Sequence, residues 1–271
     1  MQNLSDSLVR QVESSSALTF ARALLHAAEG KELFDHDFLF ASAVATYYSL
    51  FHLGGALLLA YWSHPSSPPD HHASIRSGLE KNWRKLQSRV SPNPPQHLPD
   101  PAEAIRHDDV PRFLEQELPE LCLSLGRRNE RCALRDMREF VSYAPRMVND
   151  GQRNVLYSGC QYELPTFRTC LGQHLSRLDE FFSKSTEWIA RKHYTELHQR
   201  ILSADFILFE FNELCTYYSN SCAKRAWTIY RSVCEQQKVD WRVYRPDPTT
   251  FRLDQDDHRR RYSEIMALLG D

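Results

Sequence analysis

Residues 38–62 form an unbroken run of apolar and small residues that contains no Asp, Glu, Lys or Arg. At about 1.5 Å per residue, the run predicts a helix of roughly 37 Å. Its few polar residues recur every three or four positions, so they share one stripe of that helix. The stripe consists of Ser42, Thr46, Ser49 and His52, followed by Gly55. Because a helix that is apolar nearly all round packs inside a bundle or a membrane, we expect this helix to be central, with a neighbour lying close to the small stripe.

The flanks of this run distinguish a membrane span from a buried bundle helix. Its length is sufficient for a transmembrane helix. However, Asp35, His36 and Asp37 directly precede it, and the polar, proline-containing segment HPSSPPDHH follows it. No Lys/Arg cluster marks a cytoplasmic side, and the sequence has no second run of this kind. We therefore expect the central helix of a soluble bundle and no membrane association.

Apolar periodicity predicts further helices on both sides of the central one. Few glycines and few alternating apolar and polar residues indicate an all-α fold. Five prolines within residues 91–101 predict a stiff exposed connection, and 145–163 contains an Asn-Asp-Gly turn that predicts a loop. The expected helices span residues 18–28 before Gly30, 71–90 after an N-cap at Asp70, 111 to about 126, 127–144, 165 to about 193, a stretch that reaches Glu235, and a short segment around 265–269.

Charge and cysteine content limit the class of protein. The 271 residues carry a formal net charge of −2, and neither half is strongly basic or acidic, so nucleic-acid binding requires a local patch. The seven cysteines are odd in number and lack CxxC spacing, which argues against a disulfide framework and a zinc finger and favours a reducing compartment. The first residues lack the apolar core of a signal peptide. We expect a cytoplasmic protein.

Two sequence motifs resemble those of a known family. The central helix reads ASAVATYYSLFHLGGALLL at residues 41–59, with small residues, paired tyrosines and Phe-His. A later helix contains REFVSY at residues 138–143, which is similar to an Arg-x-x-Ala-Asp-Tyr element, and a long closing helix follows it. In this order the motifs resemble those of HEPN domains, small helical bundles of bacterial and archaeal toxins, antiviral systems and RNA-processing proteins.

The resemblance covers roughly residues 16–193. It implies an HEPN-like helical bundle at residues 1–193, and we assign residues 194–271 to a helical C-terminal extension. Such bundles commonly pair, so we expect a homodimer or a complex with a partner protein.

The resemblance also implies a chemistry. Many HEPN domains are metal-independent RNases in which a His lies four to six residues after an Arg. A histidine can move the proton of the RNA 2′-OH, and an arginine can stabilise the charge on the phosphate. Three local candidates exist in this sequence: Arg138 with Tyr143, Arg153 with Asn154 and Tyr157, and Arg168 with His174.

Only Arg168 with His174 has the conventional residue types, because a tyrosine with an ordinary pKa near 10 is a poor base at neutral pH. This pair lies within the closing helix instead of at its start. Its alternative interpretation is an exposed arginine beside a histidine that packs between helices.

Two further groups are candidates for nucleic-acid binding. One is a basic helix face that can contact phosphates, although the favoured interpretation is a solvated face paired with Glu130, Asp136 and Glu139. A C-terminal group of alternating aromatic and arginine residues can stack bases and bind phosphates, or pack on the bundle or a partner subunit. These groups are Arg128, Arg131 and Arg135 with Arg138 on the helix, and Trp241, Arg242, Tyr244 and Arg245 near the C-terminus.

We therefore expect an HEPN-like component of a prokaryotic defence or toxin–antitoxin system that acts on RNA or binds it within a complex. The alternative is a catalytically inactive scaffold or adaptor subunit that binds a partner protein. Endoribonuclease activity is undecided at this point because the Arg–His motif is degenerate. No cofactor and no metal site are expected.

Overall fold

The structure of the protein is a computed structural model. It describes residues 6–64, 71–89, 99–126, 132–147, 163–192, 194–202 and 220–240, and single residues near the C-terminus. Within these ranges every regular element is a helix and none is a strand, so the all-α prediction is confirmed. The helices are α1 (Asp6–Asp35), α2 (Leu39–Ser63), α3 (Ala73–Gln87), the 3₁₀ turn η1 (Pro101–Ala104), α4 (Asp109–Glu117), α5 (Pro119–Leu125), α6 (Leu134–Met147), α7 (Leu164–Ser176), α8 (Leu178–Arg191), α9 (Thr195–Ile201) and α11 (Asn220–Gln236).

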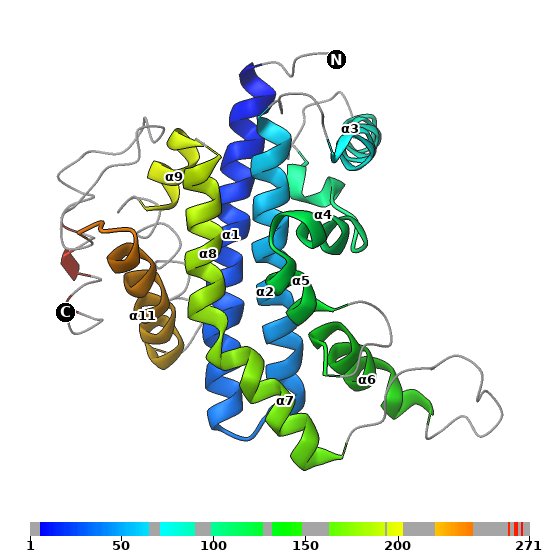
Figure 1. Cartoon of the computed structure of the whole chain (residues 1–271), viewed down its shortest axis with the longest axis vertical. Helices are drawn as coiled ribbons and strands as arrows, with labels where there is room; N and C mark the ends of the chain where they lie inside the picture. Colours follow the sequence, from blue (N-terminus) through cyan, green and yellow to red (C-terminus); the bar gives the residue numbers. More distant parts are fainter. Residues whose placement is uncertain are drawn as a thin grey trace.

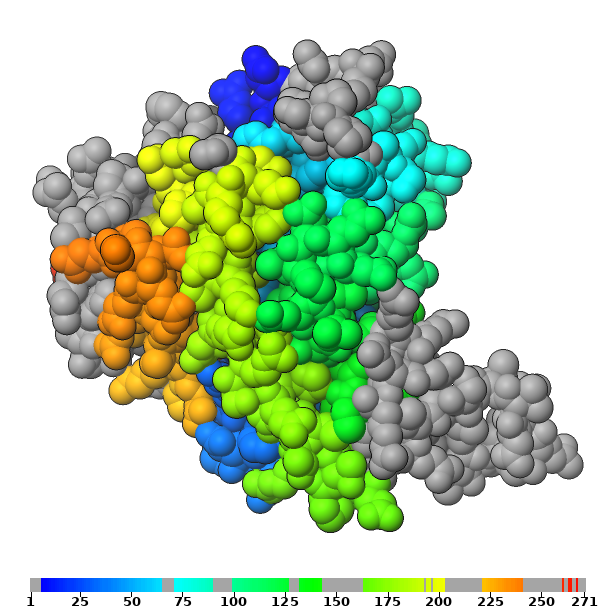
Figure 2. All heavy atoms as spheres, in the orientation of Figure 1, coloured from blue at the N-terminus to red at the C-terminus, as the bar shows by residue number. Residues whose placement is uncertain are grey.

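Helices α1 and α2 form an antiparallel hairpin at the centre of the molecule (Figure 1). Helix α8 lies along the hairpin, α11 lies beside α1 and α8, and α3 to α5 lie on the side of α2. Helices α6 and α7 lie near the end where the hairpin turns. On the face seen in Figure 2, the hairpin is visible mainly at its two ends because the other helices cover its middle. This enclosure explains why α2 tolerates an uncharged sequence.

The small stripe of α2 faces α1, as its spacing predicts. Ser42 Oγ donates a 2.7 Å hydrogen bond to the backbone oxygen of Gly30, and Ser49 Oγ donates one of 2.9 Å to that of Ala23. In the opposite direction, Ser16 Oγ of α1 donates to the oxygen of Ala56 at 2.8 Å. A side chain as short as serine reaches the backbone of a neighbouring helix only if the two helix axes lie close together. The stripe therefore fixes the spacing of the hairpin.

The first helix continues past Gly30, where the sequence predicted its end. We expected residues 18–28 to be helical and Gly30 to stop them, but α1 runs from Asp6 to Asp35. A Cβ at Gly30 would lie 2.7 Å from Thr46 Oγ1, so glycine at this position permits contact with α2. The chain turns instead at Asp37, whose φ of 64° lies in the left-handed region.

Other boundaries also differ from the expected ones. The segment from 111 to 126 is two helices, α4 and α5, separated at Leu118, and the helix expected at 165–193 divides into α7 and α8 at Arg177. Helix α6 begins at Leu134 and passes through Pro145, where we predicted a loop. The expected N-cap Asp70 lies outside the described residues.

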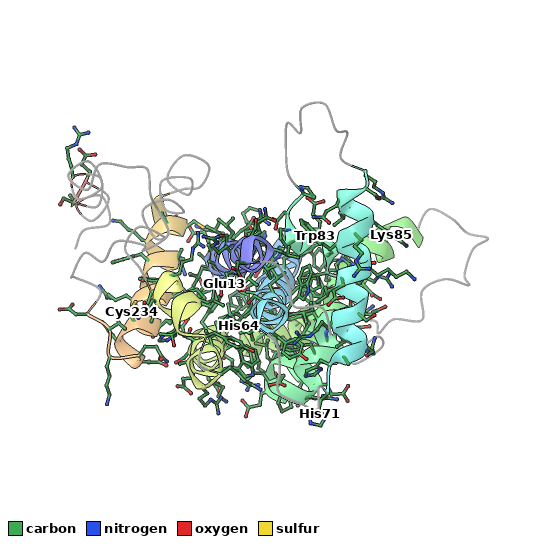
Figure 3. The ribbon with its side chains drawn as sticks, turned by 90° about the horizontal axis from the view of Figure 1, so that it is seen from above. Glu13, His64, His71, Trp83, Lys85 and Cys234 are labelled. Atoms are coloured by element: carbon green, nitrogen blue, oxygen red, sulfur yellow. A yellow bond between two sulfur atoms is a disulfide. The ribbon has the colours of Figure 1, made fainter. Side chains whose placement is uncertain are left out.

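The elements around the hairpin join one hydrophobic core. Trp83 of α3 is 4% exposed and points toward the hairpin, whereas Lys85 points away from it (Figure 3). Helix α11, from the predicted C-terminal extension, contributes Trp227 and Tyr230 to the same core. Arg225 of α11 also forms 2.6 Å ion pairs with Glu32 and Asp35 at the end of α1. The described part of the extension thus packs directly on the central hairpin.

A polar network joins α4 to α8. Glu117 binds the ring of the buried His72 at 3.1 Å, the indole of Trp188 at 2.8 Å and the ammonium of Lys192 at 3.0 Å. The hydrogen bond from His72, together with those from Trp188 and Lys192, lowers the pKa of Glu117 to about 2 despite partial burial. The carboxylate therefore stays ionised and keeps both helices attached beside α2.

One described helix, α2, is long and apolar enough to cross a membrane by length and composition. However, 78% of its most apolar window is buried inside the protein. The core helix of a globular protein has this same property.

The structure changes the expectation about cysteines. Cys132, just before α6, forms a disulfide with Cys170 of α7, although the spacing of the seven cysteines argued against a disulfide framework. Cys122, Cys222 and Cys234 form no disulfide and are buried. Cys160 and Cys215 lie outside the described residues. The two paired residues are 38 positions apart, and only the fold brings them together.

The contact of α4 with α2 leads to a prediction about Gly54. A Cβ at Gly54 would lie 2.6 Å from Val110 Cγ1 and 2.8 Å from Leu114 Cδ1, whereas one at Gly78 would meet nothing within 4 Å. Both glycines are inside helices, so the gain in helix propensity from alanine cancels between them. We expect Gly54→Ala to be less stable than Gly78→Ala by about 1–3 kcal/mol in urea unfolding. Equal stability of the two variants would contradict the packing.

Candidate nucleic-acid interface

Four ring-bearing side chains lie on one face of α2. Tyr47, Tyr48, Phe51 and His52 occupy positions i, i+1, i+4 and i+5, which share a side of a helix. Their ring centroids lie close to one another: 5.3 Å for Tyr47–Tyr48, 6.0 Å for Tyr47–Phe51 and 6.0 Å for Tyr48–His52. The sequence of α2 thus builds a continuous set of rings along one edge of the hairpin.

Two histidines from other elements extend this set at both ends. His26 of α1 stacks on His52 with centroids 5.3 Å apart, and its Nδ1 lies 3.1 Å from a carboxylate oxygen of Glu29. His107, between η1 and α4, stacks on Phe51 at 4.6 Å, and its Nδ1 lies 3.3 Å from Tyr47 Oη. We call the six rings the aromatic row, and in spatial order they are His26, His52, Tyr48, Tyr47, Phe51 and His107.

Helix α6 places an arginine on the aromatic row. The guanidinium carbon of Arg138 lies 5.5 Å from the ring centre of Tyr47 and 5.9 Å from that of Tyr48. Arg138 Nη2 also donates a 3.3 Å hydrogen bond to Tyr48 Oη. A guanidinium within about 6 Å of a tyrosine face is attracted by the negative π-surface. Among the described candidates from the basic helix face, Arg138 is the one that contacts aromatic rings.

Arg135 has a different environment. Its guanidinium lies 3.3 Å from Glu139 and 3.3 Å from Asp108, so two carboxylates offset its charge. This arrangement matches the ion-paired interpretation that the sequence favoured for this helix face. Arg135 thereby links α6 to the loop that carries His107.

The aromatic row is partly accessible. Tyr47 is buried and packs against its neighbours in the row. Tyr48, Phe51, His52 and His26 are half-buried, and His107 is exposed. A planar ligand can therefore reach the edges of several rings without a rearrangement of the helices.

Burial and neighbouring charge shift the pKa values along this row. Burial, with smaller contributions from His26 and Arg22, lowers the pKa of His52 to about 4. Although His107 as a whole is exposed, its ring stacks on Phe51, and desolvation of the ring, with the nearby Arg138 and Arg135, lowers its pKa. Burial raises the pKa of Tyr47. His52 and Tyr47 are therefore neutral at pH 7, and the positive charge on this part of the row comes from arginine.

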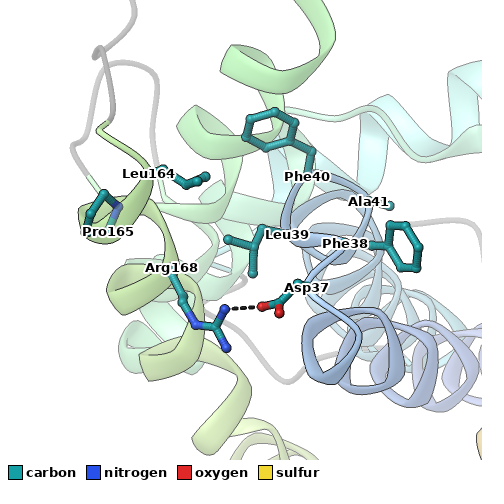
Figure 4. A pocket seen from close by; sticks show the side chains of 8 residues that line it. All are labelled: Asp37, Phe38, Leu39, Phe40, Ala41, Leu164, Pro165 and Arg168. Carbon is teal, nitrogen blue, oxygen red and sulfur yellow. Dashed lines mark hydrogen bonds and ion pairs between the residues drawn. The ribbon is translucent and has the colours of Figure 1, made fainter.

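Arg168 and His174, the pair with conventional catalytic residue types, have separate partners. Arg168 pairs with Asp37 and lies over the ring of Phe34 at 5.2 Å, beside an open groove of about 770 Å³ (Figure 4). His174 Nε2 instead lies 2.6 Å from the backbone oxygen of Cys132, and burial lowers its pKa. The two side chains do not converge on one site.

The groove beside Arg168 is lined mainly by apolar side chains. Phe38, Phe40 and Leu164 are 63%, 49% and 59% exposed, which is high for large hydrophobic residues. Phe40 also contacts Phe167 of α7, with ring centres 5.4 Å apart.

The remaining candidates lie outside the described part of the chain. For Tyr143 only the backbone, within α6, is described. Nothing is described for the others, which are Arg128, Arg131, Arg153, Asn154, Tyr157, Trp241, Arg242, Tyr244 and Arg245. Among the described residues, no group of three or more His, Cys, Asp or Glu side chains is arranged to hold a metal ion.

The sequence interpretation missed His26 and His107. His26 could have been found from the hairpin, because His26 and Tyr48 lie at equal distances from the turn between α1 and α2. No local signal marked His107, since it reaches the row from a non-helical connection. His52 was noted as a residue of the small stripe and of the Phe-His motif, and the stacking with His26 shows that it lies at the edge of that stripe.

No protein-family model, curated protein or solved structure matches this chain. The HEPN-like interpretation consequently rests on the motifs of the sequence, and the aromatic row rests on the geometry alone.

The lowered pKa of His52 gives a prediction about pH. Its value in the unfolded chain is near 6.5, so between pH 6.5 and 4 the unfolded chain binds a proton that the folded protein does not. Acidification through this range should therefore lower the free energy of unfolding of the wild type. The decrease should be roughly 2–3 kcal/mol larger than that of His52→Phe over the same range. NMR titration of the His52 ring, assigned with that variant, should give a pKa near 4. A value of 6 or above would show that the ring is hydrated.

Proposed function

We propose that this protein binds single-stranded RNA along the aromatic row. The observation that carries the proposal is the position of Arg138 over Tyr47 and Tyr48, within a continuous series of six rings. Single-stranded nucleic acids are bound by aromatic platforms that stack bases and by arginines that contact phosphates. In this site the exposed ring of His107 would stack on a base, the accessible parts of the half-buried Tyr48 and Phe51 would contact neighbouring bases, and Arg138 would contact the backbone.

Binding fits the site better than cleavage does. An efficient general base needs a pKa near the working pH. The pKa values of His52, His107 and His174 are all lowered, which makes each of them a weaker base. For cleavage, Arg168 and His174 would have to act on the same phosphate. Arg168 instead pairs with Asp37, and His174 contacts the backbone oxygen of Cys132.

In the context of its resemblance to HEPN domains, we propose that the chain is an RNA-binding component of a prokaryotic defence or toxin–antitoxin system. A partner protein would supply any catalytic groups that the described bundle lacks. Both statements depend on the motifs at residues 41–59 and 138–143.

Arg138→Ala should weaken binding to a fluorescent single-stranded RNA of about 20 nucleotides by at least tenfold, measured by anisotropy at 50 mM salt. Because one phosphate contact is lost, the slope of log K against log salt should become shallower by about 0.7. Tyr48→Leu should weaken binding through lost stacking, which contributes on the order of 1–3 kcal/mol per base.

The matched control is Arg84→Ala, which removes one positive charge from the exposed outer face of α3. It should change the affinity by less than twofold. Equal losses in Arg84→Ala and Arg138→Ala would mean that binding depends on net charge and not on the aromatic row. A nuclease would instead be supported if the wild type cleaves RNA in the presence of EDTA and His52→Ala or His174→Ala abolishes this cleavage.

The groove near the hairpin turn supports a second candidate function, a scaffold that binds a partner protein. Phe38, Phe40 and Leu164 expose apolar surface there, and an Asp37–Arg168 ion pair lies at its edge. Large exposed apolar groups gathered in one place are typical of protein interaction sites. Absence of RNA binding at low salt in the experiment above would favour this function over the first.

A further inference from the structure

The disulfide joins the helix that carries Arg138 to the rest of the bundle. Cys132 lies two residues before α6, and Cys170 lies in α7, with Cα atoms 5.4 Å apart. Arg138 follows less than two helical turns after Cys132. The disulfide therefore restrains α6 at the end from which Arg138 is positioned.

A second observation shows that the backbone at Cys132 is held in place. Its φ of 66° lies in the left-handed region, which is unfavourable for a residue other than glycine. His174 of α7 binds the backbone oxygen of Cys132 at 2.6 Å, so α7 holds this residue through both its side chain and its backbone. A conformation of this kind persists only where several contacts determine it.

The other cysteines argue that this disulfide does not belong to a structural framework. Among the described residues, Cys122, Cys222 and Cys234 are buried thiols that form no disulfide. Several thiols outside any disulfide are typical of proteins from reducing compartments, where a disulfide is usually transient, catalytic or redox-sensing. Cys132 is partly exposed, whereas Cys170 is 5% exposed, so a small reagent reaches Cys132 first.

We propose that Cys132 and Cys170 form a redox-controlled clamp that holds Arg138 of α6 against the aromatic row and thereby strengthens RNA binding. This inference rests on the proposed function of the row. With a low-molecular-weight disulfide as oxidant, the Cys132 thiolate attacks one of its sulfurs and releases one small thiol. The Cys170 thiolate then attacks Cys132 Sγ in the mixed disulfide and releases the second small thiol. The protein loses two electrons and two protons, which the oxidant gains.

The experiment compares full-length protein treated with glutathione disulfide or with dithiothreitol. Non-reducing peptide mapping should find the 132–170 cross-link only in the oxidised sample. Amide hydrogen exchange in α6, at residues 135–140, should be at least tenfold faster after reduction, while amides 75–83 of α3 serve as an internal control. RNA affinity should fall at least fivefold on reduction.

The matched variant is Cys132→Ser with Cys170→Ser. Its exchange and affinity should equal those of the reduced wild type under both treatments. The proposal is overturned if glutathione disulfide forms no cross-link, if α6 exchanges equally in both states, or if bound RNA is held equally well by both. If α6 responds to reduction but neither state binds RNA, the clamp on α6 is supported and the proposed RNA-binding function fails.

Discussion

Serine hydroxyls of α1 and α2 bind backbone oxygens of the opposite helix, and this is feasible only because small residues line the contact. Ser42 reaches Gly30, Ser49 reaches Ala23 and Ser16 reaches Ala56, each within 2.9 Å. The hydrogen bonds satisfy buried polar groups, so burial of the serines is not penalised. They also fix the register of the hairpin. The surrounding described helices, including α8, α11 and the short helices, pack around this hairpin.

The same register creates the aromatic row. With the small stripe of α2 turned toward α1, the neighbouring face with its two tyrosines lies at the edge of the contact, where His26 of α1 meets His52. Helix α6 then crosses this edge and lays Arg138 over the tyrosines. Its position depends on apolar packing through Leu134 and Met137 and on the disulfide to α7. The site therefore combines a rigid platform with a cation on a separately attached helix.

Local patterns predicted the platform better than its surroundings. The uncharged run predicted both ends of α2 to within one residue, since few structures other than a buried helix accommodate such a sequence. Gly30 was misinterpreted because a glycine that ends a helix and one that admits a neighbouring helix look alike in sequence. The division of α7 from α8 at Arg177 has no marker residue. His107 and the Cys132–Cys170 pair depend on contacts between elements far apart in the chain, which periodicity does not encode.

The contact between Arg138 and Tyr48 forms only if the hairpin register, the aromatic row and the placement of α6 are all as described, so it is the most informative contact to measure. A double-mutant cycle with Arg138→Ala and Tyr48→Ala, measured as unfolding free energy on oxidised protein, isolates their interaction. We expect a favourable coupling of about 0.5–2 kcal/mol, the range for a cation–π contact with a hydrogen bond. Additive effects of the two substitutions, within about 0.3 kcal/mol, would contradict it.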